Sequence, residues 1–141
     1  MSDFQVHAAP WLQYRDQLST LRRLVFIEEL AIPAHLEWEE QDARCTYFLA
    51  LTGHDKAIGC VRITPQAQIG RLAVLPQWRR RGVGSALTRA GINHLQGLGY
   101  TELYINAQHS AIEFYLRLGF SLVGDEFFEA GIAHRKMRIR P

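Results

Sequence analysis

The sequence predicts a single α/β domain, residues 1–141, in which a central sheet carries helices packed on both faces. Two observations lead to this fold class. Along the chain, apolar residues recur alternately with the period of two that is typical of strands and the period of 3.6 that is typical of helices. The length of 141 residues and the 48% of hydrophobic residues allow one domain with a sizeable core. The sequence has no internal repeat and no linker rich in Pro, Gly or Ser.

The first half of the chain predicts a helix followed by a β-hairpin. Within residues 14–30, apolar residues recur with helical spacing at Leu18, Leu21, Leu24, Val25 and Phe26. Pro33 ends this helix, and the surrounding stretch AIPAHLEWEEQDA (31–43) predicts an acidic loop. The stretches TYFLAL (46–51) and AIGCVRI (57–63) predict two strands joined by a turn that contains Gly and Asp.

The second half predicts two strand–helix units and a final hairpin. QIGRLAVL (68–75) is a strand, and the following apolar stripe predicts a helix through Val83, Leu87, Ala90 or Gly91, Leu95 and Leu98. TELYIN (101–106) is the next strand. A second amphipathic helix, closed by Gly119, carries its apolar residues at Ala111, Phe114, Tyr115 and Leu118. Residues 120–140 have the alternating pattern of a hairpin.

Composition and charge exclude several classes of protein. The formal net charge is only +2, whereas nucleic-acid-binding domains usually carry a larger and clustered excess. The N-terminal residues lack the pattern of a signal peptide, and no apolar run approaches a membrane span, so we expect a cytoplasmic protein without membrane contact. Cys45 and Cys60 predict reduced, buried thiols. The six histidines are scattered and form no metal-binding motif, so no metal is expected.

Three consecutive arginines, Arg79, Arg80 and Arg81, lie between the end of a predicted strand and the start of a predicted helix. Backbone N–H groups at a helix start are unsatisfied, and the helix dipole adds about half a positive charge there. Gly82 and Gly84 carry no Cβ, so an anion can approach this backbone closely. The arrangement suits a pyrophosphate held by main-chain amides with arginine charge around it. A solvated basic turn is the alternative.

The loop is neither a dinucleotide-binding fingerprint nor a P-loop. The third glycine of GxGxxG is replaced by Leu87, and no Gly-Lys-Ser/Thr follows. Instead, LAVLPQWRRRGVGSAL (72–87) resembles the signature of the GNAT superfamily of acyl-CoA-dependent N-acyltransferases, an (Arg/Gln)-x-x-Gly-x-(Gly/Ala) loop directly after a strand. The stretch AIEFYLRLGF (111–120) is similar to the last helix of that family. The resemblance extends from the first helix to the last strand.

A narrower resemblance is to the ElaA-like and YjcF-like branch of the superfamily. It rests on the stretches at 22–42 and 127–137, with a VFxxEQ-type helix, an acidic segment and a GIxHxxM tail. Leu30, Tyr47 and Asn106 depart from the residues common in that branch. The family implies a GNAT-like fold with one mixed, mostly antiparallel sheet of about six to seven strands and about four helices.

The resemblance implies acetyl-CoA as the cosubstrate. The strand at Leu72–Val74 would splay from its neighbour and pair with the pantetheine arm, and the amide of Leu72 would face the thioester carbonyl. Cofactor-binding residues expected from the resemblance are Leu72, Ala73, Val74, Arg79, Arg80, Arg81, Gly82, Val83, Gly84, Ser85, Asn106, Ala111 and Phe114. Leu72 and Val74 also fit a simple role as core residues of a strand.

The expected catalytic residues are Tyr115 and Glu28. By the resemblance, the phenol of Tyr115 would protonate the departing CoA thiolate; a core tyrosine is the alternative. Glu28 is the first candidate for the general base because an acid three and four residues after apolar positions would lie on a desolvated helix face. Glu29, His109 and His134 are the further candidates. A structural role for each, or proton loss relayed by water, stays open.

Together these features predict an N-acetyltransferase that transfers acetyl from acetyl-CoA to a primary amine by direct attack in a ternary complex. Neither cysteine has the context of a nucleophile that would form an acyl-enzyme. The acidic loop Glu37–Asp42 would favour a cationic amine, small molecule or peptide, unless it is only solvated. The rival predictions are a non-catalytic acyl-CoA sensor or interaction module of the same fold, and a nucleic-acid binder. The oligomeric state stays open, a homodimer included.

Overall fold

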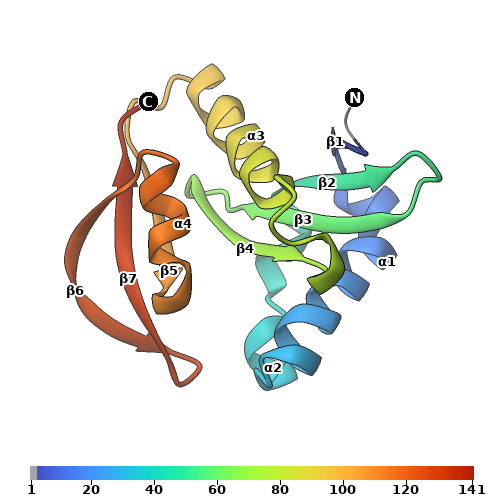
Figure 1. Ribbon diagram of the computed structural model, residues 1–141, viewed down its shortest axis with the longest axis horizontal. Helices are drawn as coiled ribbons and strands as arrows, with labels where there is room; N and C mark the ends of the chain where they lie inside the picture. Colours follow the sequence, from blue (N-terminus) through green and yellow to red (C-terminus); the bar gives the residue numbers. More distant parts are fainter. Residues whose placement is uncertain (1–2) are drawn as a thin grey trace.

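The computed structural model describes residues 3–141 (Figure 1). Its strands are β1 (Phe4–Ala8), β2 (Thr46–Thr52), β3 (Ala57–Ile63), β4 (Gln68–Val74), β5 (Leu103–Gln108), β6 (Ser121–Glu129) and β7 (Ile132–Ile139). Its α-helices are α1 (Trp11–Arg22), α2 (Ala34–Glu37), α3 (Val83–Gly97) and α4 (Ile112–Arg117). A π-helical segment η1 (Arg23–Glu29) continues α1, and short 3-10 turns are η2 (Glu40–Arg44), η3 (Pro76–Trp78) and η4 (His109–Ala111).

Within residues 3–141, seven strands form one sheet in the order β1-β2-β3-β4-β5-β7-β6. Neighbouring strands are antiparallel except for β4 and β5, which are parallel. The parallel pair is joined only at Gln68↔Tyr104 and Ile69↔Ile105, after which the two strands separate (Figure 1). The sheet is therefore divided into a β1–β4 half and a β5–β7–β6 half that meet only near the start of β4.

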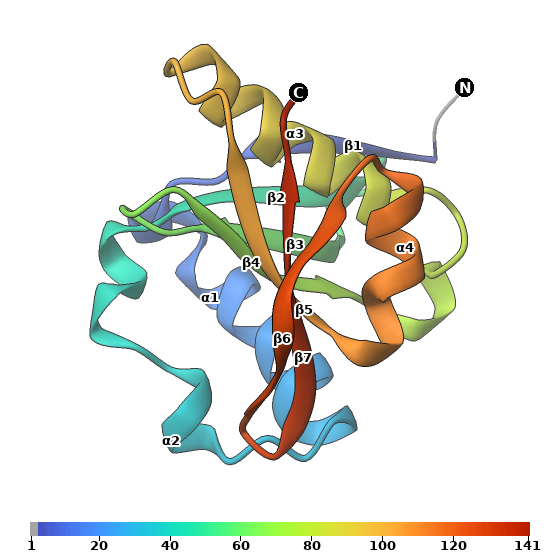
Figure 2. The ribbon, with the colours of Figure 1, turned by 90° about the vertical axis from the view of Figure 1, so that its left-hand side faces the viewer.

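Helices cover both faces of the sheet, as the sequence predicts. A Cβ atom at Gly59 would lie 3.0 Å from side-chain atoms of Val83 and Leu87, so this position of β3 faces α3. Arg62, on the opposite face of β3, bonds to Asp42 in η2. In Figure 2, α4 lies to the right of β6 and β7, while α1 and α2 lie to their left. The core between these layers includes the fully buried residues Leu18, Leu49, Ile58, Leu87 and Met137.

The fold class and the mixed, mostly antiparallel sheet are confirmed, and three local predictions need correction. β1 was not predicted, because FQVHA is short and pairs only at the edge of the sheet, with β2. The predicted acidic loop contains α2 and η2 rather than irregular chain. The predicted helix at 14–30 begins earlier and ends as a π-helix. No helix in the described part of the chain is long and apolar enough to cross a membrane.

Candidate functional site

The bulge in β4 is the first element of the site. β4 pairs with β3 at Gly70↔Arg62 and at Ala73↔Cys60, so Arg71 and Leu72 lie opposite the single residue Val61. Arg71 takes a left-handed conformation with φ of 46°, as one residue of such a bulge can. A bulge takes residues out of the ladder and turns the strand. The backbone around Leu72 is therefore outside the regular hydrogen-bond ladder with β3, at the level where β5 also separates from β4.

The second element is the start of α3. Gly82 precedes the helix with φ of 85° and no side chain caps the helix. The first amide that bonds back is that of Ala86, which donates to the carbonyl of Gly82. The amides of Val83, Gly84 and Ser85 therefore have no partner within the helix, and the positive end of the helix dipole adds to their attraction for an anion. The predicted strand–loop–helix placement is correct.

Gly84 brings three elements together. A Cβ atom on Gly84 would lie 3.3 Å from Cζ of Phe114 in α4 and 3.8 Å from Cδ2 of Leu72 in β4. A glycine at this position lets α3 approach both neighbours closely. Three residues predicted from the motif thus meet where the separated strands open onto the amides of α3. The space beside Gly82 is open, since a Cβ there would contact nothing within 4 Å.

The three arginines of the loop have different surroundings. Arg79 forms an ion pair with Glu29 at the end of η1, and its Nε donates to the carbonyl of Val74 at 3.0 Å. The guanidinium of Arg81 stacks on the ring of Trp78 at 4.3 Å. Arg80 is exposed, has φ of 60°, and makes no hydrogen bond or ion pair within residues 3–141.

These surroundings change the expected role of the arginines. The prediction that all three side chains surround an anion is not supported for Arg79, because both terminal nitrogens of its guanidinium donate to the carboxylate of Glu29. Arg81 also contacts Asp3, at 3.3 Å. The sequence could not reveal these contacts, since Glu29 lies 50 residues from Arg79. Arg80 is the arginine of the loop whose charge is not matched by a described residue.

Tyr115 is buried in α4 between two other aromatic rings. Its ring lies 4.9 Å from that of Phe114 and 5.6 Å from that of Phe120, both edge-on. Burial raises the pKa of its phenol, so the hydroxyl is protonated at neutral pH. No hydrogen bond to this hydroxyl is found within residues 3–141. The packing fits a core tyrosine, and the unpartnered hydroxyl retains a proton to donate.

The remaining predicted cofactor residues lie around the separation of β4 and β5. Asn106 follows directly on Ile105, the last β5 residue paired with β4. Ala111 ends η4 just before α4. Ala73 and Val83 are buried, whereas the side chains of Val74 and Ser85 are half-buried.

Glu28 does not have the environment that was expected of a base. Its side chain is 53% exposed and forms an ion pair with Arg23. The expectation assumed 3.6 residues per turn, but residues 23–29 form a π-helix, in which positions five apart are neighbours. The desolvated helix face assumed for Glu28 is therefore wrong. Glu29 is held by Arg79, which keeps the pKa of its carboxyl below the usual value, and His109 is exposed.

His134 has the most defined environment among the base candidates. It is buried in β7, with Nδ1 2.7 Å from the carbonyl oxygen of Ile132. A carbonyl only accepts hydrogen bonds, so Nδ1 carries the proton and Nε2 keeps its lone pair when the ring is neutral. The ring stacks on Phe127 at 5.7 Å, and Nε2 lies 3.9 Å from a carboxylate oxygen of Glu129. This imidazole can accept a proton at Nε2.

The acidic segment is paired with arginines of the same chain. Arg22 donates to Glu37 at 2.7 Å and to Asp42 at 3.0 Å, and all three residues are buried. Arg62 donates to Asp42 at 2.9 Å, and Arg71 lies 3.3 Å from Glu37. Glu37, Glu39 and Asp42 are therefore already paired, and the expectation that the loop favours a cationic amine stays a prediction. The burial of Arg22 could have been inferred from the sequence, because Arg22 lies four residues from Leu18 and from Phe26 on the apolar stripe of the helix.

Opposing effects act on the two buried carboxyls. Burial raises the pKa of Glu37, against the pull of Arg71 and Arg22. Burial acts in the same sense on Asp42, but hydrogen bonds from Arg22 and Arg62 hold its pKa below the usual value. The hydroxyl of Tyr47 also donates to Asp42, at 3.2 Å from Oδ1, which accounts for Tyr47 being buried here.

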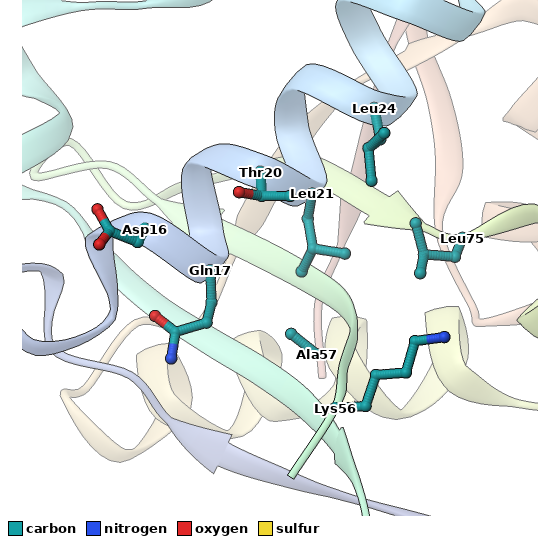
Figure 3. A pocket seen from close by; sticks show the side chains of 8 residues that line it. All are labelled: Asp16, Gln17, Thr20, Leu21, Leu24, Lys56, Ala57 and Leu75. Carbon is teal, nitrogen blue, oxygen red and sulfur yellow. The ribbon is translucent and has the colours of Figure 1, made fainter.

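A pocket of about 340 Å³ lies elsewhere, between α1 and the adjoining ends of β3 and β4 (Figure 3). Leu21 and Leu24 form its wall from the helical side, and Leu75 and Ala57 form the opposite wall. The polar residues Asp16, Gln17, Thr20 and Lys56 complete its lining. None of the residues predicted to bind the cofactor lines it.

Comparisons with known proteins agree with this geometry. A family model described as an acetyltransferase (GNAT) domain matches residues 23–141. The uncharacterized N-acetyltransferase YjcF of Bacillus subtilis is 30% identical over 121 residues, which cover 83% of this chain and 86% of YjcF. The structure of Escherichia coli ElaA superposes with a TM-score of 0.81 at 23% identity, over 99% of both chains.

A further structure similar to this chain contains the expected cosubstrate. It is a GNAT family acetyltransferase from Elizabethkingia anophelis with acetyl-CoA bound, with a TM-score of 0.70 at 15% identity over 100% of both chains. At 15% identity this comparison supports a shared fold alone.

Proposed function

This chain belongs to the acetyltransferase (GNAT) domain family, and we propose that it transfers an acetyl group from acetyl-CoA to a primary amine by direct attack in a ternary complex. The observation that most directly supports the proposal is the close approach of Leu72 and Phe114 to Gly84. At this point the gap between β4 and β5 opens onto three unpartnered amides.

The residues present fit acetyl-CoA. The amides from Arg80 to Ser85 would hold the pyrophosphate, with Arg80 as the available side-chain cation. The edge of β4 at Leu72–Val74, free of β5, would pair with the pantetheine arm. When bound, acetyl-CoA supplies the acetyl group: the amine nitrogen bonds to the thioester carbon as the carbon–sulfur bond breaks.

Two groups of the chain act on the charge that develops. The amide of Leu72, taken out of the ladder by the bulge, would donate to the carbonyl oxygen as it gains negative charge. The phenol of Tyr115 would give its proton to the departing sulfur. Because burial raises the pKa of Tyr115, its hydroxyl enters the reaction protonated.

The amine must lose a proton before it can attack, and we assign this step to His134 in place of Glu28. Its Nδ1–H is held by the carbonyl of Ile132, so Nε2 is the accepting atom. Glu28 is paired and exposed, and Glu29 is held by Arg79. His134 lies in register with Gln108, two residues beyond Asn106 in β5. A proton could pass to it directly or through one water.

The proposal is tested in two steps. Acetyl-CoA at a hundredfold excess over its Kd should stabilise the fold by about 2.7 kcal/mol, detected as a rise in Tm. Release of free CoA thiol is then followed with pools of amines. Binding with no turnover on any amine would instead indicate a non-catalytic acyl-CoA sensor. An unchanged Tm at millimolar acetyl-CoA and CoA would remove the cofactor assignment.

A further inference from the structure

Arg71 has a backbone conformation that usually belongs to glycine. Its φ of 46° lies in the left-handed region, which residues with a Cβ atom avoid. Where a β-bulge contains a left-handed residue, that residue is ordinarily glycine. A glycine lies one position earlier, at Gly70, yet the left-handed residue of the bulge is the arginine. A residue other than glycine keeps this conformation only where its surroundings hold it there.

The side chain of Arg71 is bound at the end of α2. Its Nη2 donates to the main-chain carbonyl of Glu37 at 3.2 Å, and its Nε lies 3.3 Å from Oε2 of the same residue. Nη2 also lies 3.6 Å from a carboxylate oxygen of Glu39. The Arg71 side chain is 23% exposed, so water screens these contacts only in part. Because a main-chain carbonyl takes part, the contacts fix the place of the guanidinium as well as matching its charge.

The main partner of Arg71 is itself held in place. The carboxylate of Glu37 accepts a hydrogen bond from Nε of Arg22 at 2.7 Å, and both side chains are buried. The main-chain carbonyl of Glu37 accepts a second bond from Arg22, at 2.8 Å, beside the one from Arg71. Arg22 is the last residue of α1. The guanidinium of Arg71 is therefore bound to a fixed part of the fold.

The acidic segment, Glu37–Asp42, also holds the strand that faces the bulge. Arg62 in β3 pairs with Gly70, directly before the bulge. Nη1 of Arg62 donates to Glu39 at 2.5 Å and to Asp42 at 2.9 Å. Glu39 thus lies between an arginine of β3 and an arginine of β4, at the point where the pairing of these two strands is interrupted. The acidic segment therefore binds both strands at the bulge.

We propose that Arg71 is a positioning residue for acetyl transfer: held by the acidic segment, its side chain keeps its own backbone left-handed and so keeps the amide of Leu72 available to the thioester oxygen. This inference rests on the proposed acetyl transfer. Arg71 itself touches no reacting atom. An amide that is out of place stabilises the oxyanion less well, so loss of the Arg71 contacts should lower kcat. The α3 amides proposed to hold the pyrophosphate belong to another element, so affinity for CoA should hardly change.

The test compares replacements of Arg71 that differ in backbone preference. Arg71→Met removes the ionic contacts and keeps a Cβ atom, so the left-handed conformation loses its support and kcat should fall at least about tenfold. Arg71→Gly removes the whole side chain, yet glycine takes this conformation unaided, so kcat should stay within about threefold of the parent. Arg71→Lys keeps a charge for the acidic segment and should retain more activity than Arg71→Met. Recovery by glycine is not expected of a residue that acts only through an ion pair.

Three measurements separate positioning from stability. Steady-state kinetics with an amine that the parent acetylates gives kcat, and calorimetry gives the Kd for CoA, which should stay within about threefold in every variant. Amide hydrogen exchange of the chain without CoA follows Leu72 directly: its rate should differ from the parent's in Arg71→Met and match it in Arg71→Gly. Arg138→Met is the matched control, because Arg138 is a strand arginine of similar exposure, 29%, that pairs with Glu102 in another part of the sheet.

The outcomes separate this inference from the proposed function. Equal losses of kcat in Arg71→Met and Arg71→Gly, or a lower Tm with unchanged kcat in Arg71→Met, would overturn the positioning role and leave acetyl transfer intact. Should Arg71→Met not fold, Arg71→Ala takes its place with the same expectations, since alanine also avoids the left-handed region. If the parent binds acetyl-CoA but acetylates no amine, the proposed function itself fails and the role of Arg71 with it.

Discussion

Arg79 holds Glu29 with both of its terminal nitrogens, Nη1 lying 2.7 Å from Oε2 and Nη2 lying 2.5 Å from Oε1. The contact ties the end of the first helical segment to the loop that begins α3. With the bond from Arg79 Nε to the carbonyl of Val74, it connects three parts of the proposed site. Arg79 is thus placed to position the loop, and in the proposed complex Arg80 would be the arginine that faces the phosphates.

Exchanging Glu29 for Gln should therefore weaken CoA binding even though Glu29 touches no phosphate. We expect Glu29→Gln and Arg79→Met to raise the Kd for CoA by similar factors, about three- to tenfold, as for loss of a partly exposed ion pair. Arg80→Met should lose affinity with a reduced dependence on salt. Calorimetry on the three variants measures these values. A large effect of Arg79→Met with none for Glu29→Gln would mean that Arg79 contacts the cofactor directly.

The same pair predicts a small pH dependence of stability. Hydrogen bonds from Arg79 lower the folded-state pKa of Glu29. Its contribution is therefore complete above the unfolded pKa of about 4.3 and is lost as the pH falls through the lower folded value. Because both side chains are more than a third exposed, at most about 1 kcal/mol is at stake. Urea denaturation of the parent and Glu29→Gln should converge below pH 3.

Gly82 offers a test of the anion site that separates charge from shape. Gly82→Asn and Gly82→Asp add side chains of nearly equal size, and both residues tolerate the left-handed φ of 85° better than other residues do. Only Asp adds negative charge beside the free amides. We expect Gly82→Asp to bind CoA at least about tenfold more weakly than Gly82→Asn. Gly53→Asp, on the β2–β3 turn, is the control for added charge; equal Kd values for the two Gly82 variants would contradict the phosphate site.

Tyr115→Phe removes one oxygen and keeps the aromatic packing with Phe114 and Phe120. If the phenol protonates the leaving sulfur, kcat should fall by about 10²–10⁴-fold while the Kd for acetyl-CoA hardly changes. Steady-state kinetics with an amine that the parent acetylates provides the measurement, and thermal unfolding provides the control for folding. An unchanged kcat, with chemistry rate-limiting, would leave Tyr115 as a packing residue.

His134→Gln keeps a polar side chain in β7 and removes the imidazole base. If Nε2 accepts the proton of the amine, kcat/KM should fall by about 10²-fold or more while the Kd for acetyl-CoA hardly changes. Steady-state kinetics and calorimetry measure these two values. A His134→Gln variant with the parent's kcat/KM would return the proton to water or to another residue.

Two adjacent arginines provide a matched pair for stability. Arg22→Met leaves Glu37 and Asp42 buried without their shared partner and should cost about 3–5 kcal/mol. Arg23→Met breaks only the exposed pair with Glu28 and should cost no more than about 0.5 kcal/mol. Urea denaturation at neutral pH measures both. Equal losses would mean that the buried cluster contributes little beyond the packing of its side chains.

Local patterns in the sequence were sufficient to predict most of the strands and helices of this protein. The alternation of apolar periods predicted β2 to β7 and the helices between them, because backbone hydrogen bonding sets those periods within a few residues. The loop from Arg79 to Gly84 predicted a strand–loop–helix anion site for the same reason. The β1 strand was not predicted, because an edge strand of five residues shows too little alternation of apolar and polar residues to be recognised.

Only the tertiary structure decided which charges are free. Arg79 and Glu29 are 50 residues apart, and Arg22 lies 15 and 20 residues from Glu37 and Asp42, so their pairing depends on how the helices and strands pack. The side chain of Glu28 is exposed because a π-helix changes which residues are neighbours on the helix surface. The sequence alone does not show that residues 23–29 form a π-helix. The separation of β4 from β5, which the family resemblance implied and local periodicity did not, and the bulge at Arg71 likewise depend on strand pairing. Contacts between distant segments form only where the whole chain buries its apolar surface, so local periodicity cannot specify them.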